Sequence, residues 1–285
     1  MTDPKIDYIR VFPADELGGN PAAIVLEADG LSLLEMQGIA ADYGHESGFV
    51  VHPSTPGTDF RFRFFVPNHE MEMCGHATLG ALWLLRRAGR WRTDFAKVET
   101  LSGVVIGEFQ AKTGLIRISQ PAGRVVPIAH GGVIDQILET LGLSADELMP
   151  VGIVNATTSR TKTLIPLRSV ERLNKLTPKL SQIKAVCDAL GSTGLYPFAA
   201  GSTEKNAFQA RQFPRSSGYP EDAATGIAAA ALLYGALRYG LVTLSNDVVK
   251  IRQGVAMGRA SEIFVQFQAP GDASKGCWVS GAVDC

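Results

Sequence analysis

The sequence is poor in cysteine, and its few cysteines lack a spacing that binds metal. Four occur among 285 residues, with no CxxC pair and no Cys/His pair of the kind that holds zinc. A chain of this length with so little cysteine rarely depends on disulfides. We therefore expect a reduced, cytoplasmic protein without a disulfide framework or a structural zinc site. The four are Cys74, Cys187, Cys277 and Cys285.

The sequence also lacks an excess of charge and a long apolar run. Its 27 Lys and Arg residues face 28 Asp and Glu residues, and no basic run exceeds Arg86-Arg87. A surface that follows the phosphates of a nucleic acid would carry a cationic excess. No stretch approaches the about 18 consecutive apolar residues that suggest a membrane span, and Met1–Lys5 begins no apolar leader. Neither nucleic acid nor a membrane is an expected partner.

What the sequence does contain is an internal repeat. With a constant offset of 151 residues, the segment 74–89 resembles the segment 225–240. Each segment is typical of a helix that begins at a glycine, has small residues in its first turns and ends before a second glycine. Because both segments are apolar nearly all round, we predict that each helix is buried. The matched pairs are Gly75 with Gly226, Ala77 with Ala228, Leu82 with Leu233, Trp83 with Tyr234, Arg87 with Arg238 and Gly89 with Gly240.

The elements before each helix repeat in the same order. The pattern predicts strand, helix, strand and strand over 22–26, 32–43, 47–52 and 61–67, and again over 163–167, 179–190, 194–199 and 208–214. This order, together with the length of the chain, predicts two homologous units of α/β or α+β type. The alternative is a chance recurrence of two Ala/Leu helices. We place the domains at 1–120 and 121–285, with the last strands, 262–268 and 278–281, free to return to the first domain.

We expect the chemistry at the two repeated helix starts. A helix N-terminus presents unpaired N–H groups and a partial positive charge, which bind carboxylates. Two such ends that face each other across a cleft between domains would hold a small anionic substrate from both sides. An acid where a helix gives way to an apolar strand, such as Glu46, is a further candidate for proton transfer. The candidates at the helix starts are Glu70, Glu72, Cys74, Gly75 and His76 in the first half and Glu221, Asp222, Thr225 and Gly226 in the second.

Each candidate has a plainer interpretation, which the residues alone leave open. Glu46 could be a solvated loop acid, and His76 could be a core or capping histidine. Asp222 could cap the N-terminus of its helix, which is the commoner role of aspartate in that position. Cys74 could be a small buried apolar residue.

Five short motifs, taken in order along the chain, are similar to those of one protein family. They are Gly19-Asn20-Pro21-Ala22-Ala23, Glu46-Ser47 before Phe49-Val50, CGHATLG from Cys74 to Gly80, Arg211-Gln212-Phe213-Pro214 and EDAATG from Glu221 to Gly226. Together they resemble the PhzF (phenazine biosynthesis) family. The resemblance implies an α+β, diaminopimelate epimerase-like fold. In that fold, two pseudo-symmetric domains each wrap a curved mixed sheet around a central helix, and the active site lies in the cleft between them.

The resemblance also implies an isomerase that works as a homodimer without metal or cofactor. The best-known member isomerises trans-2,3-dihydro-3-hydroxyanthranilate, in which a glutamate removes a proton and returns it elsewhere. Glu46 matches that general base and acid, and His76 and Asp222 match its catalytic partners. The expected substrate is a small carboxylate, cyclic or amino-acid-like. The positions that match the substrate-binding residues are Asn20, Cys74, Gly75, Thr225 and Gly226.

Two departures from the family motifs keep other activities open. Ile227 stands where a serine is typical, and His45 stands where a small polar residue is usual, so the substrate could differ. Racemases of this fold place a cysteine at each helix start, whereas Cys74 has only Thr225 as its counterpart. A two-thiol racemase or epimerase is therefore disfavoured, and a hydroxyproline-type dehydratase remains an alternative. The remaining alternative, a non-catalytic ligand-binding protein, would have no need of Glu46.

Overall fold

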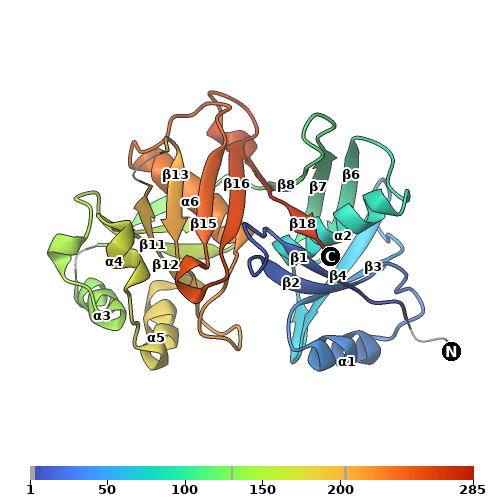
Figure 1. Cartoon of the computed structure of the whole chain (residues 1–285), viewed down its shortest axis with the longest axis horizontal. Coiled ribbons are helices and arrows are strands. Elements are labelled where there is room, and N and C mark those ends of the chain that lie inside the picture. The colour runs from blue at the N-terminus through green and yellow to red at the C-terminus, as the bar shows by residue number, and fades with distance from the viewer. Residues whose placement is uncertain (1–3, 130, 202–203) are drawn as a thin grey trace. The chain divides into compact units, whose positions relative to one another are not determined.

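The computed structural model describes residues 4–129, 131–201 and 204–285. These residues form two compact units, each of which Figure 1 traces by colour along the chain. The first unit contains the described residues up to Ser119 together with Ser280–Cys285, and the second contains Gln120–Val279. The expectation that the chain begins without an apolar leader concerns Met1–Lys5, of which Met1–Asp3 lie outside the described ranges. In the part of the chain that the structure describes, no helix is long and apolar enough to cross a membrane.

The first unit is a mixed sheet with one central and one outer helix. Its elements are β1 (Asp7–Val11), β2 (Asn20–Val25), α1 (Leu33–Tyr43), β3 (Ser47–Val51), β4 (Phe60–Val66), β5 (His69–Met71), α2 (Gly75–Arg87), β6 (Phe95–Thr100), β7 (Gly103–Phe109), β8 (Ile116–Gln120) and β18 (Val283–Asp284). The strands pair in the order β18–β1–β2–β3–β4–β6–β7–β8, and β5 forms a hairpin with β4. The β2–β3 and β4–β6 pairs are parallel.

The central helix of the first unit is α2, which packs against β1, β2 and β3. All its residues from His76 to Leu82 are buried. The helix and sheet approach so closely that a Cβ on Gly80 would lie 2.1 Å from Cδ1 of Ile9. The small residues in the first turns therefore allow the helix backbone to meet the sheet.

The outer helix α1 comes just before the candidate residue Glu46 along the chain. Ser32 and Glu35 form a capping box at its start, and Met36 and Ala40 pack on the apolar side chains of β3 and β4. The helix ends at Gly44, whose φ of 79° is readily available only to glycine. The chain therefore turns sharply here, and two residues later Glu46 precedes β3.

The second unit repeats this plan with more helices. Its elements are β9 (Arg124–Pro127), α3 (Gly132–Leu141), η1 (Ala145–Glu147), β10 (Val154–Thr157), β11 (Thr161–Leu167), α4 (Val170–Asn174), α5 (Leu180–Leu190), β12 (Gly194–Ala200), β13 (Ala207–Ala210), β14 (Phe213–Pro214), α6 (Gly226–Arg238), β15 (Val249–Gln253), η2 (Val255–Met257), β16 (Ser261–Phe267), η3 (Ala273–Lys275) and β17 (Cys277–Ser280). The strands pair in the order β9–β10–β11–β12–β13–β15–β16. The β11–β12 and β13–β15 pairs are parallel, so this sheet is mixed as well.

The two faces of the second unit's sheet have different partners. The helix α6 packs against β9, β10, β11 and β16, and its residues from Ala228 to Ala236 are buried. The helices α3 and α5, which lie side by side in Figure 1, pack on the other face through an apolar cluster that includes Ile165 and Leu195. The mixed sheets and central helices confirm the predicted α+β class.

The repeated helices have nearly the same backbone. The helices α2 and α6 are 13 residues each and begin at the predicted glycines. Their N-cap residues, Cys74 and Thr225, have φ, ψ of −132°, 111° and −130°, 93°. One residue beyond each C-cap, Gly89 and Gly240 adopt φ of 68° and 69°. The offset found in the sequence therefore holds from one end of the helix to the other.

One predicted strand of the second half is broken. The strand expected over 208–214 forms two pieces, β13 and β14, separated by Arg211 and Gln212. On the neighbouring strand β12, the residue opposite Arg211 is Pro197, which has no N–H to donate. The N–H of Arg211 still donates to Pro197 O at 3.0 Å, while Gln212 forms an isolated bridge with Asp222.

The segment that returns to the first unit is shorter than the sequence suggests. The strand expected over 262–268 stays in the second unit, where β16 pairs with β15. The returning segment is Ser280–Cys285, whose strand β18 pairs with β1. Arg10 of β1 fastens it through two hydrogen bonds to the Asp284 carboxylate, of 3.0 and 2.9 Å.

Gly254 and Gly258 flank η2. Substitutions at these two glycines test how tightly the second unit packs beside the start of α6. Gly254 and Gly258 have φ of 76° and 68°, so alanine at either position is strained by about 1 kcal/mol. A Cβ on Gly254 would also lie 2.2 Å from Arg259 O and 2.9 Å from Ala223 O. We expect Gly254→Ala to lower the free energy of unfolding by about 3 kcal/mol or more, because this overlap adds to the strain.

The measurement is chemical denaturation with Gly258→Ala as the matched control. Among the described residues, a Cβ on Gly258 meets nothing within 4 Å. Equal losses in the two variants would show that Gly254 is required only for its backbone conformation.

Candidate active site

The first unit gathers five of the predicted site residues near one edge of its sheet. Because β2 and β3 are parallel, Asn20 at the start of β2 and Glu46 just before β3 lie at the same edge. The start of α2, with Cys74, Gly75 and His76, joins them, since His76 makes a hydrogen bond to the backbone of Pro21 and interacts electrostatically with Glu46. The parallel pairing and the central helix thus bring together residues that are far apart in sequence.

Glu46 is buried at this edge. Only 6% of the residue is exposed, so the interpretation of Glu46 as a solvated loop acid is wrong. Its neighbour Ser47 is fully buried, and the Ser47 hydroxyl has no hydrogen-bond partner among the residues that the structure describes. A buried polar group without a partner is costly, so the fold bears this cost next to Glu46.

His76 is a buried histidine beside this carboxyl. It is 7% exposed, and its Nδ1 lies 3.4 Å from the Cys74 Sγ. Burial lowers the pKa of His76 because the imidazolium loses its water, and the positive charge of His45 acts in the same direction. The Glu46 charge and the Pro21 carbonyl raise this pKa in part. The net result favours a neutral imidazole, which can donate one hydrogen bond and accept another.

The second unit holds two of the predicted residues, Asp222 and Thr225, in a hydrogen-bonded network. The Asp222 carboxylate accepts hydrogen bonds from the Thr225 hydroxyl and, at 3.4 Å, from the Ala224 N–H. Gln253 Nε2 donates to Asp222 O at 2.7 Å and to Thr225 Oγ1 at 3.1 Å. Tyr196 donates its hydroxyl to Gln253 Oε1 at 3.0 Å. Asp222 therefore orders the loop before α6, and the N-cap residue itself is Thr225.

Sequence reasoning missed two members of this network, Tyr196 and Gln253. Tyr196 lies on β12 and Gln253 on β15, and only the pairing of the strands brings them under the α6 start. Burial and the Asp222 charge raise the pKa of Tyr196 well above its usual range, so its hydroxyl stays protonated as a donor. No local motif marks either residue.

Both central helices leave their first N–H groups ahead of the intrahelical ladder. The first ladder bonds run from Thr78 N to Cys74 O and from Ala229 N to Thr225 O. Within the described chain, neither the Cys74 nor the Thr225 side chain makes a capping hydrogen bond. The N–H groups of the first turn, which includes Gly75 and Gly226, can therefore bind an anion.

Glu70 and Glu221 are structural acids and not candidate proton carriers. Glu70 pairs with Arg63 through hydrogen bonds of 2.7 and 2.6 Å, and Glu221 pairs with Arg211 through bonds of 2.8 and 2.7 Å. Each arginine also lies over the phenylalanine two residues later in the sequence. The same clamp thus precedes both helices. Glu72, the third acid in these loops, is exposed.

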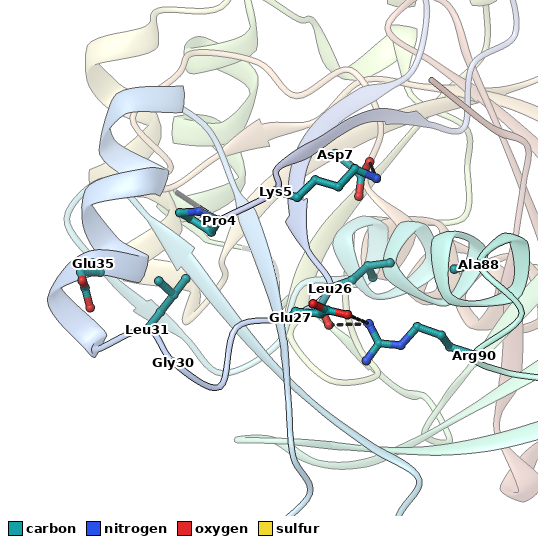
Figure 2. A pocket seen from close by; sticks show the side chains of 10 residues that line it. All are labelled: Pro4, Lys5, Asp7, Leu26, Glu27, Gly30, Leu31, Glu35, Ala88 and Arg90. Atoms are coloured by element: carbon teal, nitrogen blue, oxygen red, sulfur yellow. Dashed lines mark hydrogen bonds and ion pairs between the residues drawn. The ribbon is translucent and has the colours of Figure 1, made fainter. Parts of the chain in front are cut away.

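A hollow elsewhere on the first unit contains none of these residues. It measures about 750 Å³ and lies among Pro4, Asp7, Glu27, Leu31 and Arg90, which Figure 2 labels. Arg90 points at Glu27 and contacts its carboxylate at 3.5 Å.

In the described ranges, no group of three or more His, Cys, Asp and Glu side chains could hold a metal ion. The catalytic and binding roles of the site residues, and the cleft expected between the two groups, stay predictions.

Solved structures with the same fold include enzymes of the racemase type. The chain matches a PhzF-family phenazine biosynthesis protein of Bacillus anthracis with a TM-score of 0.86 and 24% identity, over 99% of this chain and 97% of that one. It matches a probable proline racemase of Agrobacterium radiobacter with a TM-score of 0.62 and 12% identity, over 99% of this chain and 91% of that one. The fold is therefore the diaminopimelate epimerase-like one.

Curated relatives identify the class of enzyme, which is an isomerase. A protein of Deinococcus radiodurans named an uncharacterized isomerase is 32% identical, over 98% of this chain and 92% of that protein. The trans-2,3-dihydro-3-hydroxyanthranilate isomerase of Pseudomonas aeruginosa is 28% identical, over 96% of this chain and 94% of that protein. The sequence model of the phenazine biosynthesis-like proteins (PhzC-PhzF) matches residues 9–282, and the chain belongs to that family.

The two arginine clamps should differ in strength because they differ in burial. The side chains of Arg211 and Glu221 are 9% and 11% exposed, whereas those of Arg63 and Glu70 are 18% and 21% exposed. Removing one charge of a buried pair leaves the other uncompensated. We expect Glu221→Gln to lower the free energy of unfolding by about 3 kcal/mol and Glu70→Gln by about 1 kcal/mol. Urea denaturation checks both variants, and a larger loss for Glu70→Gln would contradict this ranking.

Proposed function

We propose that the chain is a cofactor-independent isomerase that shifts a proton on a small carboxylate, with Glu46 as the group that takes the proton and returns it. The observation that carries this proposal is the burial of Glu46 beside a neutral, buried His76 at the start of α2. A carboxyl that accepts and then donates in one turnover works best where water is excluded. The substrate named for the Pseudomonas aeruginosa relative, a cyclic amino acid derivative, belongs to the proposed class.

The remaining site residues are assigned by what they can donate. In each unit, the N–H groups at the start of the central helix, α2 or α6, stabilise negative charge of the kind that a carboxylate carries and that develops in the enolate-like state after proton removal. His76 donates a hydrogen bond to the same negatively charged groups. Asn20 and Thr225 bind polar groups of the substrate. Asp222 holds the Thr225 hydroxyl and the loop before α6 in place. A proton shift of this kind needs only an acid–base group and a stabilised anion.

A second candidate function rests on the contact between Cys74 and His76. A thiol 3.4 Å from an imidazole nitrogen can lose its proton and act as a base. This arrangement favours a one-thiol dehydratase or epimerase, in which Cys74 and not Glu46 removes the proton.

A homodimer and a cytoplasmic location complete the main proposal. They are supported by the family resemblance and by the cysteine-poor sequence, respectively.

The test is the incorporation of solvent deuterium into candidate substrates, followed by proton NMR in D₂O. The candidates are trans-2,3-dihydro-3-hydroxyanthranilate and a panel of cyclic and acyclic amino acids. We expect Glu46→Gln to slow exchange by about 100-fold or more, the usual scale of a general acid–base contribution, while the melting temperature is retained.

The matched control is Glu72→Gln, which alters an exposed acid close to the same helix start and should leave the rate unchanged. Exchange that survives in Glu46→Gln but is lost in Cys74→Ala would replace this function with the one-thiol alternative. Exchange that survives in both variants would remove both functions.

A further inference from the structure

The second unit buries a lysine that the proposed function does not use. Lys162 lies on β11 and is 6% exposed. The charge of Asp222 attracts its ammonium group, and the charge of Arg160 repels it. Removing an ammonium group from water is expensive, so the burial of this charge costs the fold stability.

A glutamine in the same unit is buried in a similar way. Gln212, in the break between β13 and β14, is 1% exposed. Neither its Nε2 nor its Oε1 has a hydrogen-bond partner in the described part of the chain. An amide left with both ends unpaired costs stability, and such groups in native proteins are rare.

The strand register places these two side chains together. In the parallel β11–β12 pair, Thr163 lies opposite Leu195, so Lys162 lies beside Gly194 one step earlier. A Cβ on Gly194 would lie 2.0 Å from Gln212 Nε2 and 3.2 Å from its Cδ. The Gln212 amide therefore fills the place of the missing Gly194 side chain. The neighbouring strand, which carries Lys162, is about 5 Å away.

Both groups belong to the sheet face that meets α6. Side chains alternate along a strand, so Lys162 shares a face with Leu164, which lies against Gly235 of α6. Gly194 shares that face with Tyr196, the member of the Asp222 network described above.

Asp222 links these groups to the α6 start. Its N–H donates to Gln212 O at 3.0 Å, and its charge attracts Lys162. Burial lowers the pKa of Lys162 to about 8, against this attraction. Lys162 is therefore still mostly a cation at pH 7, when a substrate carboxylate would be an anion.

We infer that Lys162 and Gln212 form a subsite for a second anionic group of the substrate, apart from the carboxylate held at the helix starts. The ammonium and the amide N–H each donate to one oxygen of that group, and Gln212 Oε1 remains to accept a hydroxyl. This inference rests on the proposed function and narrows its substrate class to small dicarboxylic acids. The substrate would then differ from the one named for the Pseudomonas aeruginosa relative, which has a single carboxylate.

The experiment measures binding of matched acids by calorimetry at constant ionic strength. Succinate, glutarate and adipate are compared with butyrate, valerate and hexanoate, on the wild type and on Lys162→Met. We expect at least one diacid to bind the wild type about 10-fold more tightly than its monoacid. In Lys162→Met this preference should fall to within about twofold, and Gln212→Leu should reduce it by a smaller factor. Lys175→Met, which removes an exposed lysine of the same unit, should keep the full preference.

Thermal unfolding without ligand separates a binding lysine from a structural one. A lysine that serves only the ligand burdens the free protein, so Lys162→Met should melt at the same temperature as the wild type or higher. A melting temperature lowered by more than about 4 °C would overturn the inference, because Lys162 would then stabilise the fold.

The two proposals fail in different measurements. A wild type without a diacid preference, or a preference that survives in Lys162→Met, overturns the subsite whatever the deuterium exchange shows. Glu46→Gln should keep the diacid preference, because Glu46 belongs to the other unit. If that variant keeps both binding and exchange, the proposed proton carrier is wrong and the subsite stands.

Discussion

The structure depends on enclosing a helix of small residues inside a curved mixed sheet, and it meets this constraint twice. The helix α2 can approach β1 only because Gly80 has no side chain, and four consecutive alanines of α6 are fully buried. A helix enclosed along its sides keeps only its ends for function. In each unit the first-turn N–H groups of the central helix precede its ladder of hydrogen bonds, and the same kind of Arg–Glu clamp lies in the segment before that helix.

The two equivalent helix starts carry unequal chemistry. In the first unit a carboxyl, an imidazole and a thiol lie together, and these are the groups from which a proton carrier can be made. The second unit has no thiol in the equivalent place, where Thr225 is bound by Asp222. In that unit Gln253 donates to Asp222 O and Thr225 Oγ1, and the donors that remain for a ligand are those proposed for Lys162 and Gln212.

The sequence reveals the features that depend on local pattern. The two central helices were predictable to their first residue, because glycine, small residues and a terminal glycine mark them directly. The burial of Glu46 was not, since it depends on the parallel pairing of β2 with β3. Tyr196, Gln253, Lys162 and Gln212 leave no local signal, because strand register brings them together. The departure at His45 shows the same limit. Its ring packs against Tyr43, 5.9 Å between centroids, and its charge acts on His76, neither of which a motif reveals.

The central claim is that Glu46 and His76 form one coupled site, and the titration of His76 tests it most directly. The pKa of His76 can be followed by NMR of histidine-labelled protein, in the wild type and in Glu46→Gln. Burial outweighs the attraction of Glu46, so we expect His76 to titrate below its ordinary value of 6.5. In Glu46→Gln it should titrate lower still, because the carboxylate that favours the imidazolium is gone. A pKa that stays the same or rises in Glu46→Gln would contradict the coupling, and with it the assignment of proton transfer to this pair.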